Sequence, residues 1–398
     1  MRRRNLHLPD GMRDYLYAEA SRRRTLEQGL GRVFARRGYR EIITPAVEFY
    51  DIFSGEHSAV PDEELYRLFD SRGRILTLRH DMTTPIARVA AQKLAGGELP
   101  IRLCYNGPVY RRSGDHTARR DEIAQCGIEL LGAEGPRADL EVLVTAIEAL
   151  QSLGAPSFSL ELGHVGFFQA VAGALGADYA ATESLRRCIE MKNYTQLDRL
   201  LAPFDPTLPA VCALRALPRL FGSVKTIARA REIAPDDRAA AVLDELERLT
   251  GELAALGYAR HIRLDLGMVQ HIGYYTGLTF RGYLPDCGES CLTGGRYDSL
   301  CGDFGAPLPA CGFAVSPDSV LDALGGGDEP SPTATLVFYE QGCAAAAYAL
   351  VEALGTEGPC RMSLAADRRG ALREAHQLGL PGFYHVTADG SRFVAGEE

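Results

Sequence analysis

The stretch Gly107-Pro-Val-Tyr-Arg-Arg112, continued further on by Gln125-Cys-Gly-Ile-Glu129, is the part of the sequence that most constrains the fold. Both halves fall on strand-like runs, Arg102 to Tyr110 and Glu122 to Leu131. Glycine, arginine and other polar residues crowd here, where a plain hydrophobic core would not need them. The stretch is therefore a candidate for chemistry as well as for structure.

Three further segments share this composition: Leu78-Arg-His-Asp-Met-Thr-Thr84, Gly273-Tyr-Tyr-Thr-Gly277 and Thr293-Gly-Gly-Arg-Tyr-Asp298. Taken alone, each is weak evidence. A Gly-Gly-Arg-Tyr-Asp run is also typical of a tight turn. Tyr274 and Tyr275 are equally explained as core aromatic residues whose hydroxyls have partners.

Outward from these segments, the sequence predicts an α+β domain over residues 1–325. Residues 14–37 read as an amphipathic helix that Gly38 ends. The two central runs are accompanied by a helix expected at 139–153. Further strand-like runs are found at 40–43, 74–78, 157–162, 262–266, 278–281 and 312–315. From about 181 to 257 the pattern is helical, which indicates an insertion into the sheet domain.

A Gly- and Pro-rich segment, Gly325-Gly-Gly-Asp-Glu-Pro-Ser-Pro332, predicts a linker over 326–332. Beyond it, strand-like runs at 335–339, 361–364 and 382–386 alternate with helical runs at 344–354 and 368–378. Residues 333–398 are therefore expected to form a small α/β domain.

Composition narrows the class of protein. The 398 residues are 46% apolar and 24% charged, which is typical of a soluble globular protein, and the net charge of −9 argues against a large nucleic-acid surface. No apolar run is long enough for a membrane span, and no signal peptide is recognisable. The ten cysteines are scattered without zinc-site spacing, so we expect no metal, no cofactor and a cytoplasmic location.

Taken in order, the segments resemble the catalytic domain of class II histidyl-tRNA synthetases over roughly Leu8 to Leu324. Leu8-Pro-Asp-Gly-Met-Arg-Asp14 is similar to the L-P-x-G-x-x-D opening of that family, and Thr44-Pro-Ala-Val-Glu48 to its motif 1. Gly107 to Glu129 resembles motif 2, and Leu266 to Phe280 resembles the histidine-specific box. The resemblance implies an antiparallel sheet with flanking helices and a homodimer core.

Three departures from the family patterns fall on groups that serve ATP. Gln270 stands where the histidine-specific box has arginine, and Ser319 replaces the arginine of motif 3. In motif 2, Ser113 replaces an acidic residue. Adenylate formation needs cations at its charged transition state, and losing one such donor typically costs about 10²–10³-fold in rate. We therefore predict that the chain has no catalytic residues for this chemistry.

The histidine side of the site is largely kept. The resemblance assigns histidine binding to Asp81, Thr83, Arg111, Gln125, Glu129, Tyr274 and Tyr275. Asp81 replaces a glutamate in a pattern L-R-P-E-G-T, and a carboxylate there still binds an α-ammonium. Glu129 can accept a hydrogen bond from an imidazole N–H. The alternative is a fossil pocket whose polar residues only satisfy one another.

This pattern of loss and retention resembles the regulatory subunit of ATP phosphoribosyltransferase, and so does the run from Asp81 to Arg88. The resemblance implies a non-catalytic partner of a short catalytic subunit in the first step of histidine biosynthesis, which activates that subunit and transmits feedback inhibition by L-histidine. Binding of tRNA is not expected, because residues after Pro332 carry few basic side chains. A divergent histidyl-tRNA synthetase, a paralogue that transfers an amino acid to another acceptor, and a histidine-binding protein with an unrelated partner remain alternatives.

Overall fold

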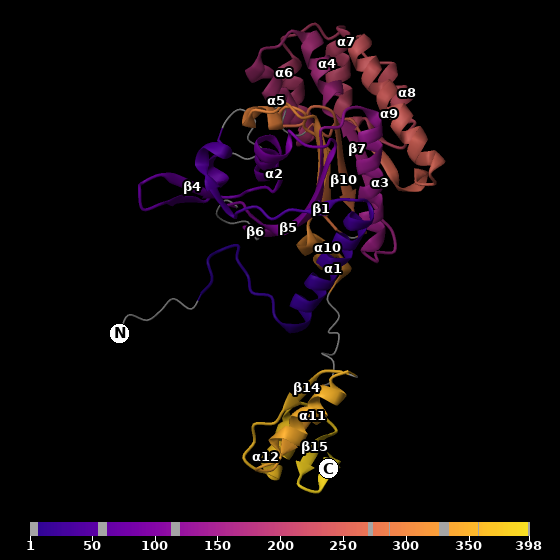
Figure 1. Ribbon diagram of the computed structural model, residues 1–398. Helices are drawn as coiled ribbons and strands as arrows, with labels where there is room; N and C mark the ends of the chain where they lie inside the picture. Colours follow the sequence, from indigo (N-terminus) through magenta and orange to yellow (C-terminus); the bar gives the residue numbers. More distant parts are fainter. Residues whose placement is uncertain are drawn as a thin grey trace. The chain divides into compact units, whose positions relative to one another are not determined.

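The computed structural model describes residues 7–54, 62–112, 120–269, 274–285, 287–325, 334–356 and 358–396. The chain divides near residue 326 into two compact units (Figure 1). Each unit has a sheet and hydrophobic clusters of its own. Within the described ranges, no helix is both long and apolar enough to cross a membrane.

The first unit is built on a nine-stranded sheet of order β1-β5-β6-β12-β11-β10-β7-β9-β8. Its strands are β1 (Arg40–Glu41), β5 (Ile101–Tyr110), β6 (Glu122–Leu131), β7 (Ser159–His164), β8 (Phe221–Gly222), β9 (Ile262–Asp265), β10 (Leu278–Tyr283), β11 (Leu292–Arg296) and β12 (Ala310–Val315). Pairing is antiparallel except at β1–β5 and β7–β9, which are parallel. The predicted fold class is confirmed, with the difference that the sheet is mixed rather than purely antiparallel.

Hydrophobic clusters lie on both faces of this sheet, because alternate residues of each strand point in opposite directions. On β5, Cys104 joins the larger cluster, whereas Leu103 and Tyr105 join the smaller one. Helices α1 (Tyr17–Arg36) and α3 (Pro136–Ser152) pack into the larger cluster. Helix α2 (Thr83–Val89) packs into the smaller one, which also holds the aromatic residues of the candidate site.

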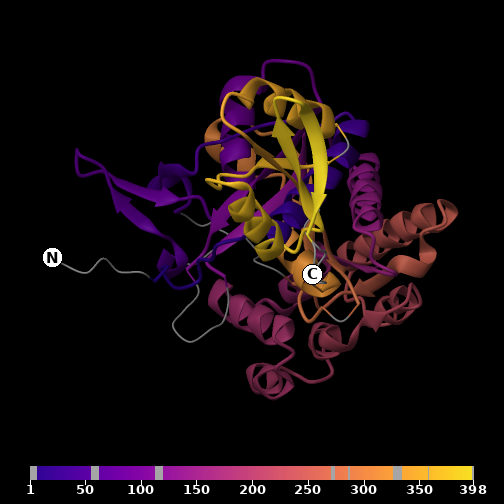
Figure 2. The ribbon, with the colours of Figure 1, turned by 90° about the horizontal axis from the view of Figure 1, so that it is seen from below.

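The helical insertion begins earlier than the sequence pattern suggests. Its helices are α4 (Val165–Leu175), α5 (Tyr179–Glu190), α6 (Tyr194–Leu201), α7 (Pro209–Ala216), α8 (Thr226–Arg231) and α9 (Asp237–Ala255). They gather at one side of the first unit (Figures 1 and 2). The short strand β8 interrupts them and pairs with β9, so the insertion is joined to the edge of the main sheet.

A three-stranded antiparallel sheet of order β2-β4-β3 lies between α1 and α2 in the sequence. It consists of β2 (Val47–Phe49), β3 (Arg67–Phe69) and β4 (Ile75–Leu78), of which only the last was anticipated from the sequence. Phe69 is 74% exposed here, and Phe49 and Ile75 are also exposed. This sheet therefore presents apolar side chains to solvent.

The second unit is a four-stranded sheet of order β14-β13-β15-β16 with one helix on each face. Its elements are β13 (Thr335–Tyr339), α11 (Ala344–Leu354), β14 (Cys360–Met362), α12 (Arg368–Gln377), β15 (Gly382–Thr387) and β16 (Gly390–Ala395). The alternation expected from the sequence is present. Strand β16, which forms an antiparallel hairpin with β15, is an addition to it.

Candidate functional site

A cavity of about 270 Å³ opens on the α2 face of the main sheet. All seven residues singled out in the sequence line it: Asp81, Thr83, Arg111, Gln125, Glu129, Tyr274 and Tyr275. They come from four separate parts of the chain that the sheet brings together. Their assignment as histidine ligands stays a prediction, whereas their convergence on one cavity is a property of the fold.

Local structure explains why these side chains converge. Gln125 and Glu129 are four residues apart on β6, so both point to the same face of the sheet. Arg111 follows β5, the neighbouring strand, directly. Asp81 lies in the turn between β4 and α2, and Thr83 is the first residue of α2.

Glu129 forms the floor of the cavity and is only 1% exposed. The Thr83 hydroxyl donates a hydrogen bond of 2.6 Å to Glu129 Oε1, and the Tyr297 hydroxyl donates one to Oε2. Burial raises the pKa of Glu129 to about 8, against these two hydrogen bonds, which lower it. A carboxyl group poised near neutral pH inside a cavity is typical of a functional site.

Gly312 on β12 makes room for this carboxyl group. A Cβ atom at position 312 would lie 1.9 Å from Glu129 Oε2 and 2.3 Å from the carbonyl oxygen of Ile128. The backbone cannot retreat, because Gly312 and Glu129 are paired residues of neighbouring strands. Only glycine fits at this position while Glu129 keeps its present place.

Gly312→Ala is therefore expected to lower the free energy of unfolding by about 1–3 kcal/mol through overpacking. It should also displace Glu129 and weaken ligand binding. Chemical denaturation and ligand titration measure the two effects. Gly302→Ala is the matched control, because a Cβ atom there meets nothing within 4 Å. Equal stability of the two variants would contradict the crowding argument.

Asp81 accepts two hydrogen bonds from Thr84 in the first turn of α2. Its Oδ1 atom accepts a hydrogen bond of 2.7 Å from the Thr84 N–H, and Oδ2 accepts one of 3.0 Å from the Thr84 hydroxyl. Burial alone would raise the pKa of Asp81, but the neighbouring His80, the Thr84 N–H and Arg111 together hold it below its usual value. Asp81 is thus an ionised carboxylate at the cavity, suited to a cationic group.

Three tyrosines form an aromatic wall. The ring centroids of Tyr274 and Tyr275 lie 4.9 Å apart, nearly perpendicular to each other, and those of Tyr274 and Tyr297 lie 5.6 Å apart in a stacked arrangement. Burial raises the pKa of each hydroxyl well above its usual value, so all three stay neutral. Such a wall accommodates a flat, partly apolar group.

Of the fourteen described lining residues, seven were not predicted as ligands from the sequence, among them Tyr297 and Glu190. Tyr297 lies within the Thr293–Asp298 segment, where the residue pattern gave it no separate role. Glu190 comes from the end of α5 in the helical insertion. Arg186 Nη1 donates a hydrogen bond of 2.6 Å to Glu190, and Arg281 Nη2 lies 3.7 Å from it. No local motif marks Glu190, because only the packing of the insertion brings it to the cavity.

Ser319, the residue that replaces the motif 3 arginine, is part of a helix cap. Helix α10 (Pro317–Leu324) begins after Ser316, whose hydroxyl oxygen accepts hydrogen bonds from the Ser319 N–H at 3.2 Å and the Ser319 hydroxyl at 3.0 Å. Ser319 is not among the residues that line the cavity. Its side chain therefore serves the start of α10.

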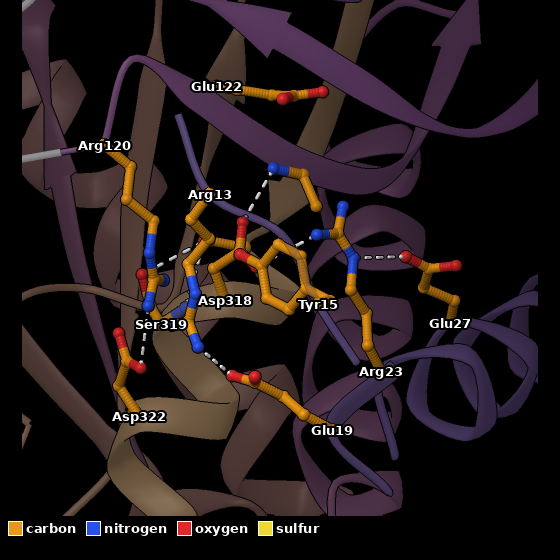
Figure 3. A network of polar contacts seen from close by, with 12 residues as sticks. Arg13, Tyr15, Glu19, Arg23, Glu27, Arg120, Glu122, Asp318, Ser319 and Asp322 are labelled. Carbon is orange, nitrogen blue, oxygen red and sulfur yellow. Dashed lines mark hydrogen bonds and ion pairs between the residues drawn. The ribbon is translucent and has the colours of Figure 1, made fainter. Parts of the chain in front are cut away.

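Ser319 lies beside a network of hydrogen bonds and ion pairs between side chains of this chain (Figure 3). The Tyr15 hydroxyl donates a hydrogen bond of 2.6 Å to Asp318 Oδ1, and the Ala124 N–H donates one of 2.9 Å to Asp318 Oδ2. Arg120 pairs with Asp322 at 2.9 Å. Arg13, Arg23 and Arg120 are thus all paired with acidic side chains of the same chain. Gln270 and Ser113, the other two departures, lie outside the described residues.

The fold and the convergence of these segments define a protein of the histidyl-tRNA synthetase class, and the family model described as histidyl-tRNA synthetase matches residues 11–320. A histidyl-tRNA synthetase from Nostoc sp. PCC 7120 shares this fold, with a TM-score of 0.76 at 18% identity over 99% of this chain and 97% of its own. Curated relatives define the family within that class more narrowly.

An ATP phosphoribosyltransferase regulatory subunit from Clostridium botulinum (strain Langeland) is 36% identical over 382 residues, 94% of this chain and 90% of its own. One from Bacillus mycoides is 39% identical, covering 81% of this chain and 77% of its own. A crystal structure from Bacillus halodurans C, titled ATP phosphoribosyltransferase regulatory subunit/histidyl-tRNA synthetase, has a TM-score of 0.85 at 28% identity, covering 96% of this chain and 98% of its own. The chain belongs to the family of ATP phosphoribosyltransferase regulatory subunits.

Proposed function

We propose that this chain is the non-catalytic regulatory subunit of an ATP phosphoribosyltransferase with a short catalytic subunit, and that L-histidine bound in the cavity of the first unit inhibits the complex. The observation that carries the proposal is the set of charges around the cavity. Asp81, Glu129 and Glu190 are acidic, and Arg111 is the one cationic side chain among the described lining residues.

These groups match the parts of a histidine molecule. Asp81 suits the α-ammonium, and Arg111 suits the α-carboxylate through guanidinium donors not used by the backbone. Glu129 suits an imidazole N–H, and the tyrosine wall suits the ring. An apolar amino acid would leave Glu129 buried without a partner from the ligand, which provides the discrimination.

Ser319 supports the non-catalytic part of the proposal. Ser319 carries no charge, and its hydroxyl donates a hydrogen bond to Ser316, so this position offers no cation to the phosphates of ATP. The sequence departures at Gln270 and Ser113 point the same way. Regulation then consists of a coupling free energy between the cavity and the partner's catalytic site, typically about 1–3 kcal/mol.

We also propose that two copies of the chain form a homodimer through the three-stranded β2-β4-β3 sheet. Its Val47, Phe49 and Leu68 lie on one face of that sheet, each more than 40% exposed, and would leave an apolar patch in water if the chain were a monomer. The acidic composition, with a net charge of −9, supports a protein partner rather than tRNA.

Co-expression with a short-form ATP phosphoribosyltransferase catalytic subunit tests the proposal. We expect the two chains to co-purify, the catalytic rate to rise in the complex, and L-histidine to inhibit it. Failure of the chains to associate, or activity that ignores both this chain and histidine, would overturn the assignment. The match to the synthetase family model makes a divergent histidyl-tRNA synthetase the second candidate, and histidine-dependent ATP–pyrophosphate exchange by the isolated chain would favour it.

A further inference from the structure

His80 is a buried imidazole directly behind the cavity. It lies in the turn between β4 and α2, is 1% exposed, and packs edge to face on Phe53 with ring centroids 4.5 Å apart. Its Nε2 atom is 3.0 Å from Asp81 Oδ2. In the L-R-P-E-G-T pattern this position is proline, so the imidazole is a feature of this chain rather than of the pattern it resembles.

The hydrogen bonding of His80 is incomplete. The contact between Nε2 and Asp81 is short, but it lacks the alignment of a hydrogen bond, and neither ring nitrogen has another partner among the described residues. Burying a polar ring without hydrogen bonds is costly. A small rotation of the Asp81 carboxylate or of the ring would complete the bond. Asp81 is the acidic group that faces His80, and the charge of Arg111 also acts on Asp81.

The main chain of His80 serves a second cavity residue. Its carbonyl oxygen accepts a hydrogen bond of 2.9 Å from Arg111 Nε. His80 thus contacts both residues proposed to bind the backbone groups of an amino acid. Its side chain contacts Asp81, proposed for the ammonium group, and its carbonyl oxygen contacts Arg111, proposed for the carboxylate. Replacing the side chain leaves the carbonyl in place, so the two roles can be separated.

We infer that His80 is a positioning residue, whose ring N–H orients the Asp81 carboxylate toward the ammonium group of a ligand in the cavity. The inference rests on the proposed function, because it takes an amino acid as the ligand. A carboxylate oxygen accepts about two hydrogen bonds, so once the rotation completes the His80 bond, the Thr84 hydroxyl and His80 together occupy Oδ2. The outer side of the carboxylate is then fixed for a donor from the ligand.

The test compares three ligands by calorimetric titration: L-histidine, histamine, which lacks the carboxylate, and imidazolepropionate, which lacks the ammonium. His80→Leu should weaken histidine and histamine about tenfold, the usual size of losing support to a charged hydrogen bond, and leave imidazolepropionate unchanged. His80→Gln, which keeps an N–H near the position of Nε2, should retain most of the affinity. If His80→Leu does not fold, His80→Asn takes its place, since its shorter amide cannot reach Asp81.

His385→Leu is the matched control. His385 is also buried, its ring nitrogens also lack hydrogen bonds among the described residues, and its Nε2 lies 3.1 Å from Glu340 in the second unit. It should change none of the three affinities. Equal weakening of all three ligands by His80→Leu, or no weakening of any, would overturn the inference while leaving the proposed function intact. Absence of histidine binding by the unaltered chain would overturn the proposed function itself.

Discussion

Above pH 8, where Glu129 is ionised, Glu129→Gln is expected to weaken L-histidine binding about a hundredfold, because a hydrogen bond from the ligand to a charged acceptor is lost in a buried site. The amide has nearly the same shape as the carboxyl group. The Thr83 and Tyr297 hydroxyls that contact Glu129 can each turn to serve as donor or acceptor. Titration of the variant with histidine measures the loss, and inhibition of the complex should weaken in parallel while activation by the chain persists.

The same substitution should stabilise the protein in a defined pH range. Burial raises the pKa of Glu129 from 4.5 to about 8 in the folded chain. Between these values the folded protein holds a proton that the unfolded chain has released, so stability falls as pH rises through this window. Glutamine does not titrate. The gain in Tm over the unaltered chain should be absent near pH 4 and grow toward pH 8.

Glu27→Gln provides the comparison, because Glu27 is also buried but lies on α1, away from this cavity. It loses ion pairs with Arg23 and Arg24 and should therefore show no gain in Tm, and histidine affinity should not change. Unchanged affinity in Glu129→Gln would support the fossil-pocket alternative, in which the polar residues only satisfy one another. A loss of affinity together with a gain in stability indicates a residue retained for binding at a cost to the fold.

Residues whose position follows from local periodicity were predictable from the sequence. Strand β6 has the bounds that its alternation indicated, and that alternation places Gln125 beside Glu129 on one face. Tyr274 and Tyr275 were found because they lie within a recognisable segment. Glu190 was not, because its place depends on how the insertion packs over the sheet, which no local pattern encodes.

The Thr293–Asp298 segment shows why local reasoning fails in other cases. Its glycines are also typical of a tight turn, but residues 292–296 form strand β11 in the middle of the sheet. A Cβ atom at Gly294 would lie 2.5 Å from the carbonyl oxygen of Gly312, and one at Gly295 would lie 2.6 Å from that of Leu278. These glycines permit close strand packing, a long-range requirement that composition alone does not distinguish from a turn.

Loss of Arg296, in the same segment, should strongly destabilise the fold. Its guanidinium pairs with Asp139 Oδ1 at 2.7 Å and with Asp298 Oδ1 at 2.9 Å. Asp139, on α3, is 2% exposed. Arg296→Met is expected to lower the free energy of unfolding by about 3–5 kcal/mol, because it leaves a buried carboxylate without its cation. Chemical denaturation at pH 7 to 8 measures this loss.

The pH dependence and a second substitution identify the cause of this loss. Burial already raises the pKa of Asp139 despite Arg296, and removing the arginine should raise it further. The cost of Arg296→Met should therefore shrink as pH falls and the carboxyl group is protonated. Adding Asp139→Asn should recover part of the loss at neutral pH, because the amide carries no charge.

The control for Arg296 is Arg37→Met, which breaks the exposed pair with Glu148 and should cost less than about 1 kcal/mol. An Arg296→Met cost of that size would contradict the buried-pair argument. A large cost that Asp139→Asn does not reduce would instead assign the loss to the packing of the arginine stem.

Arg296 also affects the cavity. It is followed by Tyr297, whose hydroxyl donates a hydrogen bond to Glu129 at the cavity floor, so the Arg296–Asp139 pair between β11 and α3 also fixes the position of Tyr297. Stability and ligand affinity should consequently fall together in Arg296→Met, whereas Glu129→Gln separates them.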